Sequence, residues 1–378
     1  MTEVTTLLGD LVRVDTSNPP GNESRAAEIL QTWLAEHSID SRLEEVEPGR
    51  ANLVARVQGA QPGKTLTFNT HMDVVPAGDG WAWEAFSGAV SDGVVRGRGA
   101  TDAKGSLAAM AGALVDLSRK AQSMKGQVQI AAVVDEEVGS AGARTLAPKL
   151  ETDGVVVGEP TNLQVMTAHK GSVRPIVEVR GRAAHAARPD RGVNALEAAA
   201  GLLRGLWKLR SSFERRTHPA LGRPTIVPVL AEAGEAPNMV PECCRITFDR
   251  RLVPPETESE AIAEIEEWLD GFHQEHPTVT AAIVDQAPTT GGASETSPGE
   301  PLVRASQKAV TDFGLSGDLG ALTVNCDMTH FRKAGVPGVI CGPGSPDAMH
   351  VVNETLSVEQ LQQAVQVYTR IVEEFLQS

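Results

Sequence analysis

The pattern of strands and helices changes twice along the chain, and these changes limit the folds that it can adopt. Up to residue 172, segments with a helical repeat of apolar residues, such as VTTLLGDLVRV, alternate with short apolar strands such as ANLVARV and TLTFNT. Residues 287–378 begin with a loop rich in glycine, serine, threonine and proline, and then return to the same alternation. Such alternation predicts an α/β domain with a mainly parallel sheet flanked by helices.

The segment between these two parts has a different order of elements. From residue 173 to residue 286 we expect the order β-α-β-β-α-β, from SVRPIVEVRG to TVTAAIVDQ. This is the plan of a small split βαβ unit. A chain of 378 residues is long enough for two domains, because single cores stop growing at about 250–300 residues. We therefore predict a discontinuous α/β domain of residues 1–172 and 287–378, with an inserted α+β domain at residues 173–286.

Charge and cysteine content bear on partners and location. There are 34 basic and 49 acidic residues, which give a formal charge of −15. We expect no nucleic-acid and no membrane partner, because both require basic patches or long apolar runs. The N-terminus lacks the basic and apolar regions of a signal peptide. The cysteines form no spaced metal-binding motif, which favours a reducing, cytoplasmic location; they are Cys243, Cys244, Cys326 and Cys341.

Histidine and acidic residues recur where predicted strands end. They follow the strands TLTFNT, QIAAVV and DGVVV, and one lies shortly after GVPGVICGPG. Another lies in the glycine-rich turn GRGATDAKGS, ahead of a predicted helix. In open α/β sheets, ligands bind beyond the carboxyl ends of the strands. The residues concerned are His71, Asp73, Asp102, Glu136, Glu137, Glu159 and His350.

Each of these residues has a simple explanation when taken alone. An aspartate after a strand is a common turn former or helix cap, a single histidine is commonly a hydrogen-bonding residue, and DEE is typical of a solvated surface. The whole set is harder to explain, because carboxylates packed at one sheet edge repel one another unless a cation is present. Two zinc ions, with cobalt as a substitute, suit this mixture of ligands better than magnesium does. The candidate ligands are His71, Asp102, Glu137, Glu159 and His350.

The remaining two residues of the set have expected roles beside the metal. We expect Asp73 to accept a hydrogen bond from the ring nitrogen of His71 that does not bind metal. Glu136 and Glu137 project to different sides, so Glu137 can coordinate while Glu136 acts as general base. The expected reaction is hydrolysis of an amide, in which a metal-bound hydroxide attacks and Glu136 passes the proton to the departing amine.

An ordered series of motifs adds a family resemblance. THMDVVP, GRGATDAKG, DEEVGS, VGEPT, GRAAHAARPDRGVNA, NMVPECCRITFDRR and MHVVNE occur in this order over nearly the whole chain. The chain resembles the co-catalytic zinc aminoacylase/carboxypeptidase family of the acetylornithine deacetylase and succinyl-diaminopimelate desuccinylase type. The resemblance implies a zinc-peptidase-like α/β domain and an inserted domain that acts in dimerisation or as a lid. It also implies that His71 and Glu159 bind one zinc ion, that Glu137 and His350 bind the other, and that Asp102 bridges them.

The resemblance implies three further site residues. His185 would reach the active site of the partner subunit and stabilise the tetrahedral oxyanion there. Asn238 and Arg251 would bind the carboxylate of the substrate, a task that suits the planar fork of arginine. Without the resemblance, His185 is better explained as a core or turn histidine, and a solvated strand residue is the alternative reading of Arg251. VNCDMTHF replaces the usual Gly-Thr-Ser-Asp run of the family, so Asn325 alters a loop that often contacts substrate.

These observations predict a cytoplasmic, homodimeric di-zinc amidohydrolase. Its expected substrate is a small N-acyl amino acid of the acetylornithine or succinyl-diaminopimelate type, from which it removes the acyl group. The alternative is a dipeptidase or carboxypeptidase of the same family, because that reaction also cleaves an amide beside a carboxylate. A non-catalytic metal-binding or scaffolding protein is a third reading, and the presence of both Asp73 and Glu136 argues against it.

Overall fold

The computed structural model describes residues 2–378, which form two compact units. The first unit contains the residues up to Ala168, together with Glu295–Leu322 and Cys326–Ser378. The second unit contains His169–Ser294 and the short stretch Thr323–Asn325. Apart from the short stretch 323–325, the chain passes between the units at 168/169 and 294/295, whereas the sequence predicts 172/173 and 286/287.

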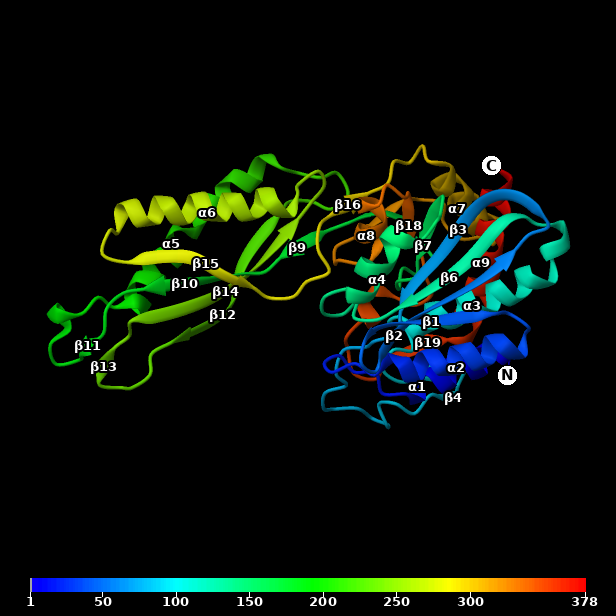
Figure 1. The fold of residues 1–378 in the computed structure, drawn as a ribbon, viewed down its shortest axis with the longest axis horizontal. Helices are drawn as coiled ribbons and strands as arrows, with labels where there is room; N and C mark the ends of the chain where they lie inside the picture. Colours follow the sequence, from blue (N-terminus) through cyan, green and yellow to red (C-terminus); the bar gives the residue numbers. More distant parts are fainter. Residues whose placement is uncertain (1) are drawn as a thin grey trace. The chain divides into compact units, whose positions relative to one another are not determined.

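The first unit is built on a nine-stranded sheet within the described residues (Figure 1). The four central strands β6, β3, β7 and β18 are mutually parallel, whereas β1, β2 and β8 pair in an antiparallel manner. This confirms the predicted mainly parallel sheet. In spatial order the strands are β1 (Ser41–Glu47), β2 (Arg50–Gln58), β6 (Lys125–Val133), β3 (Gln61–His71), β7 (Gly154–Val157), β18 (Gly338–Ile340), β8 (Met166–His169) and β16 (Ser294–Glu295), with β17 (Gly320–Leu322) paired to β8.

Helices cover both faces of this sheet because its central strands are apolar on both sides. In β6, Val128, Ile130 and Ala132 pack into one buried cluster, while Ala131 and Val133, which alternate with them, pack into another. The first cluster includes residues of α1 (Glu3–Arg13), α2 (Glu23–Glu36), α3 (Lys104–Arg119), α7 (Pro301–Asp312) and α9 (Val358–Gln377). On the other side lie α4 (Ala141–Leu146) and α8 (Met328–Lys333). A separate small sheet has the order β19 (Thr355–Ser357), β5 (Val94–Arg96) and β4 (Ala89–Ser91).

The second unit is an antiparallel sheet covered by two helices. Along the chain its main elements are β10 (Pro175–Arg180), α5 (Ala195–Ser212), β12 (Thr225–Ala233), β14 (Cys243–Leu252), α6 (Glu258–Glu275) and β15 (Thr280–Gln286), which confirms the predicted order β-α-β-β-α-β. The strands are arranged as β12-β14-β10-β15, and β9 (Gly171–Val173) pairs with β14. Alternate residues of β14, such as Ile246 and Phe248, pack against α5 and α6. A short ribbon of β11 (Ala184–His185) and β13 (Met239–Val240) is added to this plan.

The loop that contains Asn325 belongs to the second unit and not, as its sequence position predicts, to the α/β domain. The side-chain amide of Asn325 donates to Ser172 Oγ at 3.1 Å and to the carbonyl oxygen of Gly291 at 3.0 Å. These bonds explain why residues 323–325 group with the second unit, although the sequence analysis places them in the α/β domain. The next residue, Cys326, is fully buried in the first unit.

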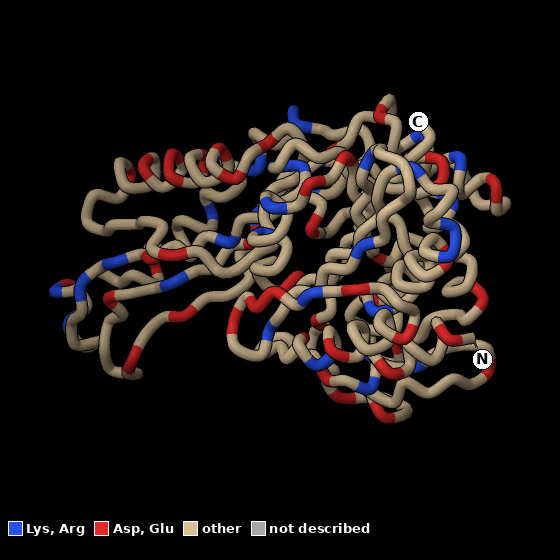
Figure 2. The backbone as a smooth tube through the Cα atoms, turned by 45° about the vertical axis from the view of Figure 1, so that its right-hand side comes forward, with Lys and Arg blue, Asp and Glu red and all other residues tan. Residues whose placement is uncertain are grey.

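Charged residues of both signs are interspersed over each unit (Figure 2). Acidic residues are frequent along α6. They are Glu258, Glu260, Glu264, Glu266, Glu267, Asp270 and Glu275. Among residues 2–378, none of the helices combines the length and apolar character that crossing a bilayer requires. All four cysteines, which lie in this described part, are free thiols.

Candidate metal centre

The carboxyl ends of three neighbouring parallel strands meet at one edge of the main sheet. His71, the last residue of β3, is in register with Val133 at the end of β6, and Asn69 is in register with Val157 at the end of β7. Residues that follow these strands by two to four positions therefore lie close together, as the sequence analysis predicts. The side chains at this edge are His71, Glu136, Glu137 and Glu159.

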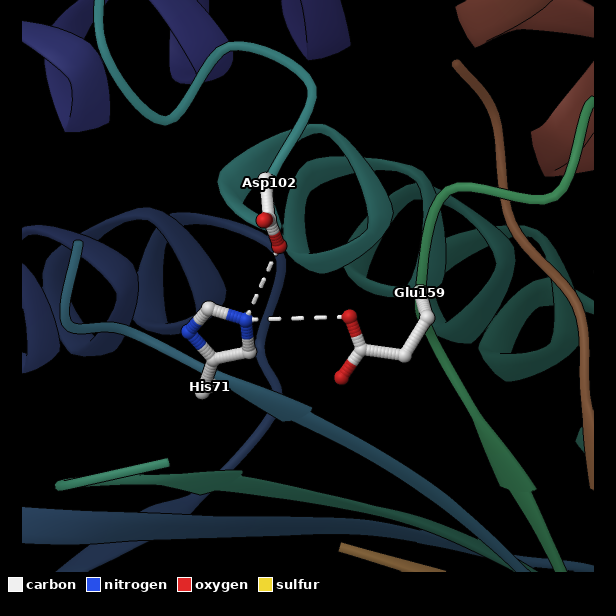
Figure 3. A group of neighbouring side chains, drawn as sticks. All are labelled: His71, Asp102 and Glu159. Atoms are coloured by element: carbon white, nitrogen blue, oxygen red, sulfur yellow. Dashed lines mark hydrogen bonds and ion pairs between the residues drawn. The ribbon is translucent and has the colours of Figure 1, made fainter. Parts of the chain in front are cut away.

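His71, Asp102 and Glu159 form the first candidate ion site (Figure 3). His71 Nε2 lies 3.3 Å from Asp102 Oδ1 and 3.8 Å from Glu159 Oε2. All three side chains are buried, and one ligand atom of each lies within 4.8 Å of the other two. The second oxygen of Glu159, Oε1, is buried without a hydrogen-bond partner among the described residues.

Asp102, Glu137 and His350 form the second candidate ion site. His350 Nε2 lies 3.0 Å from Glu137 Oε2 and 3.4 Å from Asp102 Oδ2. His350 has a positive φ of 61°, and its side chain is 53% exposed, so this site is more open than the first. Within the described chain, the buried Oε1 atom of Glu137 also has no hydrogen-bond partner.

The two sites share one carboxylate. Oδ1 of Asp102 faces His71, and Oδ2 of the same side chain faces His350. Buried carboxylate oxygens without donors are unfavourable, and cations satisfy them. The two sets of imidazole nitrogen and carboxylate oxygen therefore fit a pair of divalent ions, and this mixture suits zinc or cobalt.

The pKa values of several ionisable side chains at this sheet edge are raised, as expected where buried carboxylates lie close together. Burial raises the pKa of Glu159 to about 7, although the hydrogen bond with His71 opposes the rise. Burial, and then the charge of Glu159, raises the pKa of Glu136 well above the usual carboxyl range. Hydrogen bonds with Asp102 and Glu137 raise the pKa of His350 to about 10. Protons thus supply positive charge at this sheet edge, a role that bound cations could take over.

Asp73 supports the site through more contacts than the one expected. The backbone carbonyl of Asp73 accepts the hydrogen bond from His71 Nδ1 at 2.9 Å, and the carboxylate pairs with the same nitrogen at a longer distance, 3.5 Å to Oδ1. This bond places the ring proton on Nδ1 and leaves Nε2 as a lone-pair donor. The carboxylate also accepts the backbone N–H groups of Glu136 and Glu137, each at 3.1 Å, and the side-chain amide of Asn18 at 2.9 Å.

A buried network that the sequence does not indicate lies behind Asp73. Asn18 donates to Asp73 Oδ2 and to Asp135 Oδ1, both at 2.9 Å. Arg50 binds Glu23 through two nitrogens and also donates to Asp135 at 3.1 Å. An asparagine before two prolines predicts only a turn, so the sequence held no signal for this contact.

Replacing Asp73 tests this support. Because its carboxylate orients both Glu136 and Glu137, we expect Asp73→Ala to weaken zinc affinity by roughly 10- to 100-fold, as the loss of outer-shell partners does. Asp153→Ala is a matched control, since Asp153 accepts the backbone N–H of Thr65, which lies within β3 and six residues before His71. Isothermal titration calorimetry measures both affinities, and an unchanged affinity in Asp73→Ala would count against the assignment.

His185 and Asn238 lie beside one another in the second unit. The β11–β13 ribbon pairs His185 with Met239, and Ala186 N donates to the carbonyl oxygen of Asn238 at 2.9 Å. His185 is exposed, and its Nδ1 accepts the N–H of Ala187 at 3.1 Å. The proton of the neutral ring is therefore on Nε2, which remains a donor.

Arg251 is also in the second unit, on β14. Its Nε and Nη2 donate to the two carboxylate oxygens of Asp249, at 2.6 and 3.2 Å. Its neighbour Arg250 points to the opposite side, where it is fully buried and pairs with Glu256 at 2.8 Å. The opposite orientation of the two arginines agrees with the alternation expected for a strand.

Known proteins match this chain over most of its length. Peptidase family M20/M25/M40 matches residues 67–374. A "Probable succinyl-diaminopimelate desuccinylase" of Staphylococcus epidermidis is 38% identical over 196 residues, which cover 50% of this chain and 47% of that protein. The chain thus matches about half of that relative's length.

Two further comparisons extend over nearly the whole chain. An acetylornithine deacetylase of Salmonella paratyphi B is 28% identical over 356 residues, which cover 92% of this chain and 90% of that protein. The crystal structure of a tripeptidase from Staphylococcus aureus has a TM-score of 0.80 at 21% identity and covers 99% of this chain and 98% of that one, which shows a common fold. With its model matched over residues 67–374, the family is the one that the motifs predict, and the chain belongs to peptidase family M20/M25/M40.

Proposed function

We propose that this chain is a two-metal amidohydrolase that removes the acyl group from an N-acyl amino acid. The observation that carries the proposal is the Asp102 carboxylate, whose two oxygens face His71 and His350 separately. The desuccinylase and deacetylase names of two relatives support substrates of the succinyl-diaminopimelate or acetylornithine type.

Five residues would hold the two ions, which we propose to be zinc, with cobalt as a substitute. Bound divalent ions would lower the pKa of water at the site and polarise the carbonyl group of the amide. His71 and Glu159 would serve one ion, Glu137 and His350 would serve the other, and Asp102 would bridge them. Buried oxygens of Glu137 and Glu159 that no donor reaches among the described residues support this assignment.

Glu136 would move the proton in the reaction. Its carboxyl group is buried, and its backbone N–H is bound to Asp73 Oδ1. The positive charge of the two bound ions would lower the pKa of Glu136. Its side chain would then be a carboxylate that accepts a proton from the attacking water. The same group then donates that proton to the departing nitrogen, which splits the amide into a carboxylate and an amine.

Three residues of the second unit would contact the substrate. Nε2 of His185 is a hydrogen-bond donor suited to a developing oxyanion, because Nδ1 is occupied by Ala187. Asn238 and Arg251 would bind the substrate carboxylate, with the guanidinium shared between Asp249 and the substrate.

A homodimer would bring His185 of one protomer to the partner's site. β12 lies at the edge of its sheet, and its Val227, Val229 and Leu230 are 48%, 51% and 66% exposed. Edge strands with exposed apolar residues are suited to pairing with another chain, which supports a dimer through this strand.

Mixed dimers test whether His185 acts across the interface. A His185→Ala chain and a Glu136→Gln chain are each expected to be nearly inactive as homodimers. Their heterodimer contains one site with both residues intact, so we expect it to recover up to about half of the activity of one wild-type dimer. Verified heterodimers without recovery would show that His185 does not act in the partner's site.

The cysteines bear on where the protein works. All four are free thiols in the described part of the chain, and Cys326 and Cys341 are fully buried. Free buried thiols are typical of proteins that stay in a reducing compartment. We therefore propose a cytoplasmic location.

A dipeptidase or carboxypeptidase is the alternative, because the family includes peptidases and the cleaved bond is again an amide. A panel of N-acetylornithine, N-succinyl-diaminopimelate, other N-acyl amino acids and dipeptides, assayed with zinc-loaded protein, separates the two. We expect release of acetate or succinate from one of the acylated substrates. Release of amino acids from dipeptides alone would replace the deacylase proposal by the peptidase alternative, and inertness toward the whole panel would contradict both.

A further inference from the structure

One buried carboxylate near the candidate metal centre has no role in the proposal above. Glu354 is 1% exposed and follows His350 by four residues. Its Oε1 accepts the backbone N–H groups of Thr101 and Asp102, at 2.8 and 3.0 Å. Its Oε2 accepts the backbone N–H of Gly99 at 3.1 Å and Nη1 of Arg98 at 2.8 Å. A single carboxylate thus binds three backbone N–H groups of the loop that ends at Asp102.

The same residues also connect this loop to the segment that carries His350. Nη1 of Arg98 donates to the carbonyl oxygen of Val351 at 3.0 Å as well as to Glu354. The backbone carbonyl of Glu354 accepts the N–H of Gly97 at 3.0 Å. Two loops that are about 250 residues apart in sequence are therefore joined beside the two residues that face each other across the second ion site.

A general stabilising role does not explain this arrangement well. Burying an ion pair is costly, and replacing such a pair by apolar residues is often neutral or stabilising. The Arg98–Glu354 pair is almost fully buried, with side chains 3% and 0% exposed. The Glu354 carboxylate instead orders backbone N–H groups, including that of Asp102. These bonds fix the position of the Asp102 backbone, from which the shared carboxylate extends.

We propose that Glu354 is a positioning residue that fixes Asp102 and His350 relative to each other and thereby creates the second ion site. This inference rests on the two-ion site proposed above. The two sites depend on it unequally. The Asp102–Glu137–His350 site takes two of its three residues from the joined loops, whereas the other site keeps His71 and Glu159, which lie at the ends of β3 and β7.

Glu354→Gln tests the inference with little change of shape. The side-chain amide replaces one oxygen, so two of the four N–H groups around it would face a donor instead of an acceptor. We expect one zinc ion to bind with nearly wild-type affinity and the second to bind roughly 10- to 100-fold more weakly. Titration calorimetry with zinc alone, on chelator-treated full-length protein, measures both affinities without an activity assay.

Glu256→Gln is the matched control. Glu256 is also an acceptor, with a side chain only 10% exposed, and it binds Arg250 Nη2 at 2.8 Å, Arg216 Nη1 at 3.0 Å and the backbone N–H of Val253 at 3.1 Å. It bonds to no loop that carries a proposed metal ligand in the described chain. We expect this variant to bind two zinc ions with wild-type affinities, even if its metal-free form melts at a lower temperature.

A second variant keeps the test decisive if Glu354→Gln does not fold without metal. Arg98→Gln leaves the Glu354 carboxylate and its three backbone bonds in place but loses the guanidinium that also reaches Val351. We expect the same selective weakening of one ion, to a smaller extent. Melting of the metal-free proteins by circular dichroism identifies which variants are folded.

The outcomes separate this inference from the proposed function. Two ions bound with wild-type affinities by both variants would overturn the positioning role and leave the two-ion site standing. Equal weakening of both ions, in step with a lower melting temperature, would assign Glu354 a general structural role and would also overturn it. A wild-type chain that binds no zinc would overturn the proposed function and this inference together.

Discussion

The Glu136→Gln variant should bind both metal ions and hydrolyse its substrate at least about 100-fold more slowly than the wild-type chain. The amide has the shape of the carboxylate but cannot accept the proton of the attacking water or return it to the leaving nitrogen. The position of residue 136 is set by its backbone N–H bond to Asp73, which the substitution leaves in place. Elemental analysis and steady-state kinetics on the same preparation measure ion content and kcat.

Glu137→Gln is the informative control because it changes the adjacent residue in the same loop. Glu137 Oε2 lies 3.0 Å from His350 Nε2, so its replacement should lower ion content as well as rate. The contrast between the two variants distinguishes a proton carrier from a ligand. Wild-type turnover in Glu136→Gln would refute the general-base assignment, and a non-catalytic scaffold would show no hydrolysis to lose in either protein.

Asp102→Asn should have the larger effect, since Asp102 is the one residue shared by both ion sites. The amide has one oxygen and cannot face both histidines as an acceptor, so we expect no more than one tightly bound ion. If an ion contributes about 4 kcal/mol to transition-state stabilisation, its loss lowers kcat/KM by about 1,000-fold. Zinc titration and kcat/KM for the best substrate of the panel measure the two effects.

Asp153→Asn controls for the cost of replacing a carboxylate that binds backbone. Asp153 Oδ2 accepts the N–H of Thr65 at 2.7 Å, within β3 and six residues before His71. This variant should bind two ions and have nearly wild-type kcat/KM. An Asp102→Asn protein with two tightly bound ions and full activity would contradict the bridging role.

The ligands at the sheet edge could be predicted from sequence because each of them follows a short apolar strand that is recognisable on its own. Apolar strands such as TLTFNT and QIAAVV are recognisable by composition, and parallel pairing brings their carboxyl ends together. Once those strands are adjacent, His71, Glu137 and Glu159 must lie near one another. Asp102 and His350 are predicted from a glycine-rich turn ahead of a helix and from a position shortly after GVPGVICGPG, and the order of motifs then implies their separate roles.

The supporting contacts could not be predicted in the same way. The carbonyl of Asp73 lies nearer to His71 Nδ1 than its carboxylate does, and that carboxylate also binds the backbone N–H groups that follow β6. Glu354 is part of a quoted motif, but its partners in the Asp102 loop lie about 250 residues earlier. Asn325 likewise binds Ser172 and Gly291, which are distant in sequence but belong to the same unit, and no local pattern indicates these bonds. Such contacts depend on how loops meet in space.

The most direct test of the account is the metal content of the folded protein. Wild-type chain loaded with zinc, freed of unbound metal on a desalting column and analysed by inductively coupled plasma mass spectrometry should contain two zinc ions per chain, because the Asp102 carboxylate serves two histidines at once. Protein that retains no divalent ion after this treatment, or that retains one at a position independent of Asp102, would contradict the account.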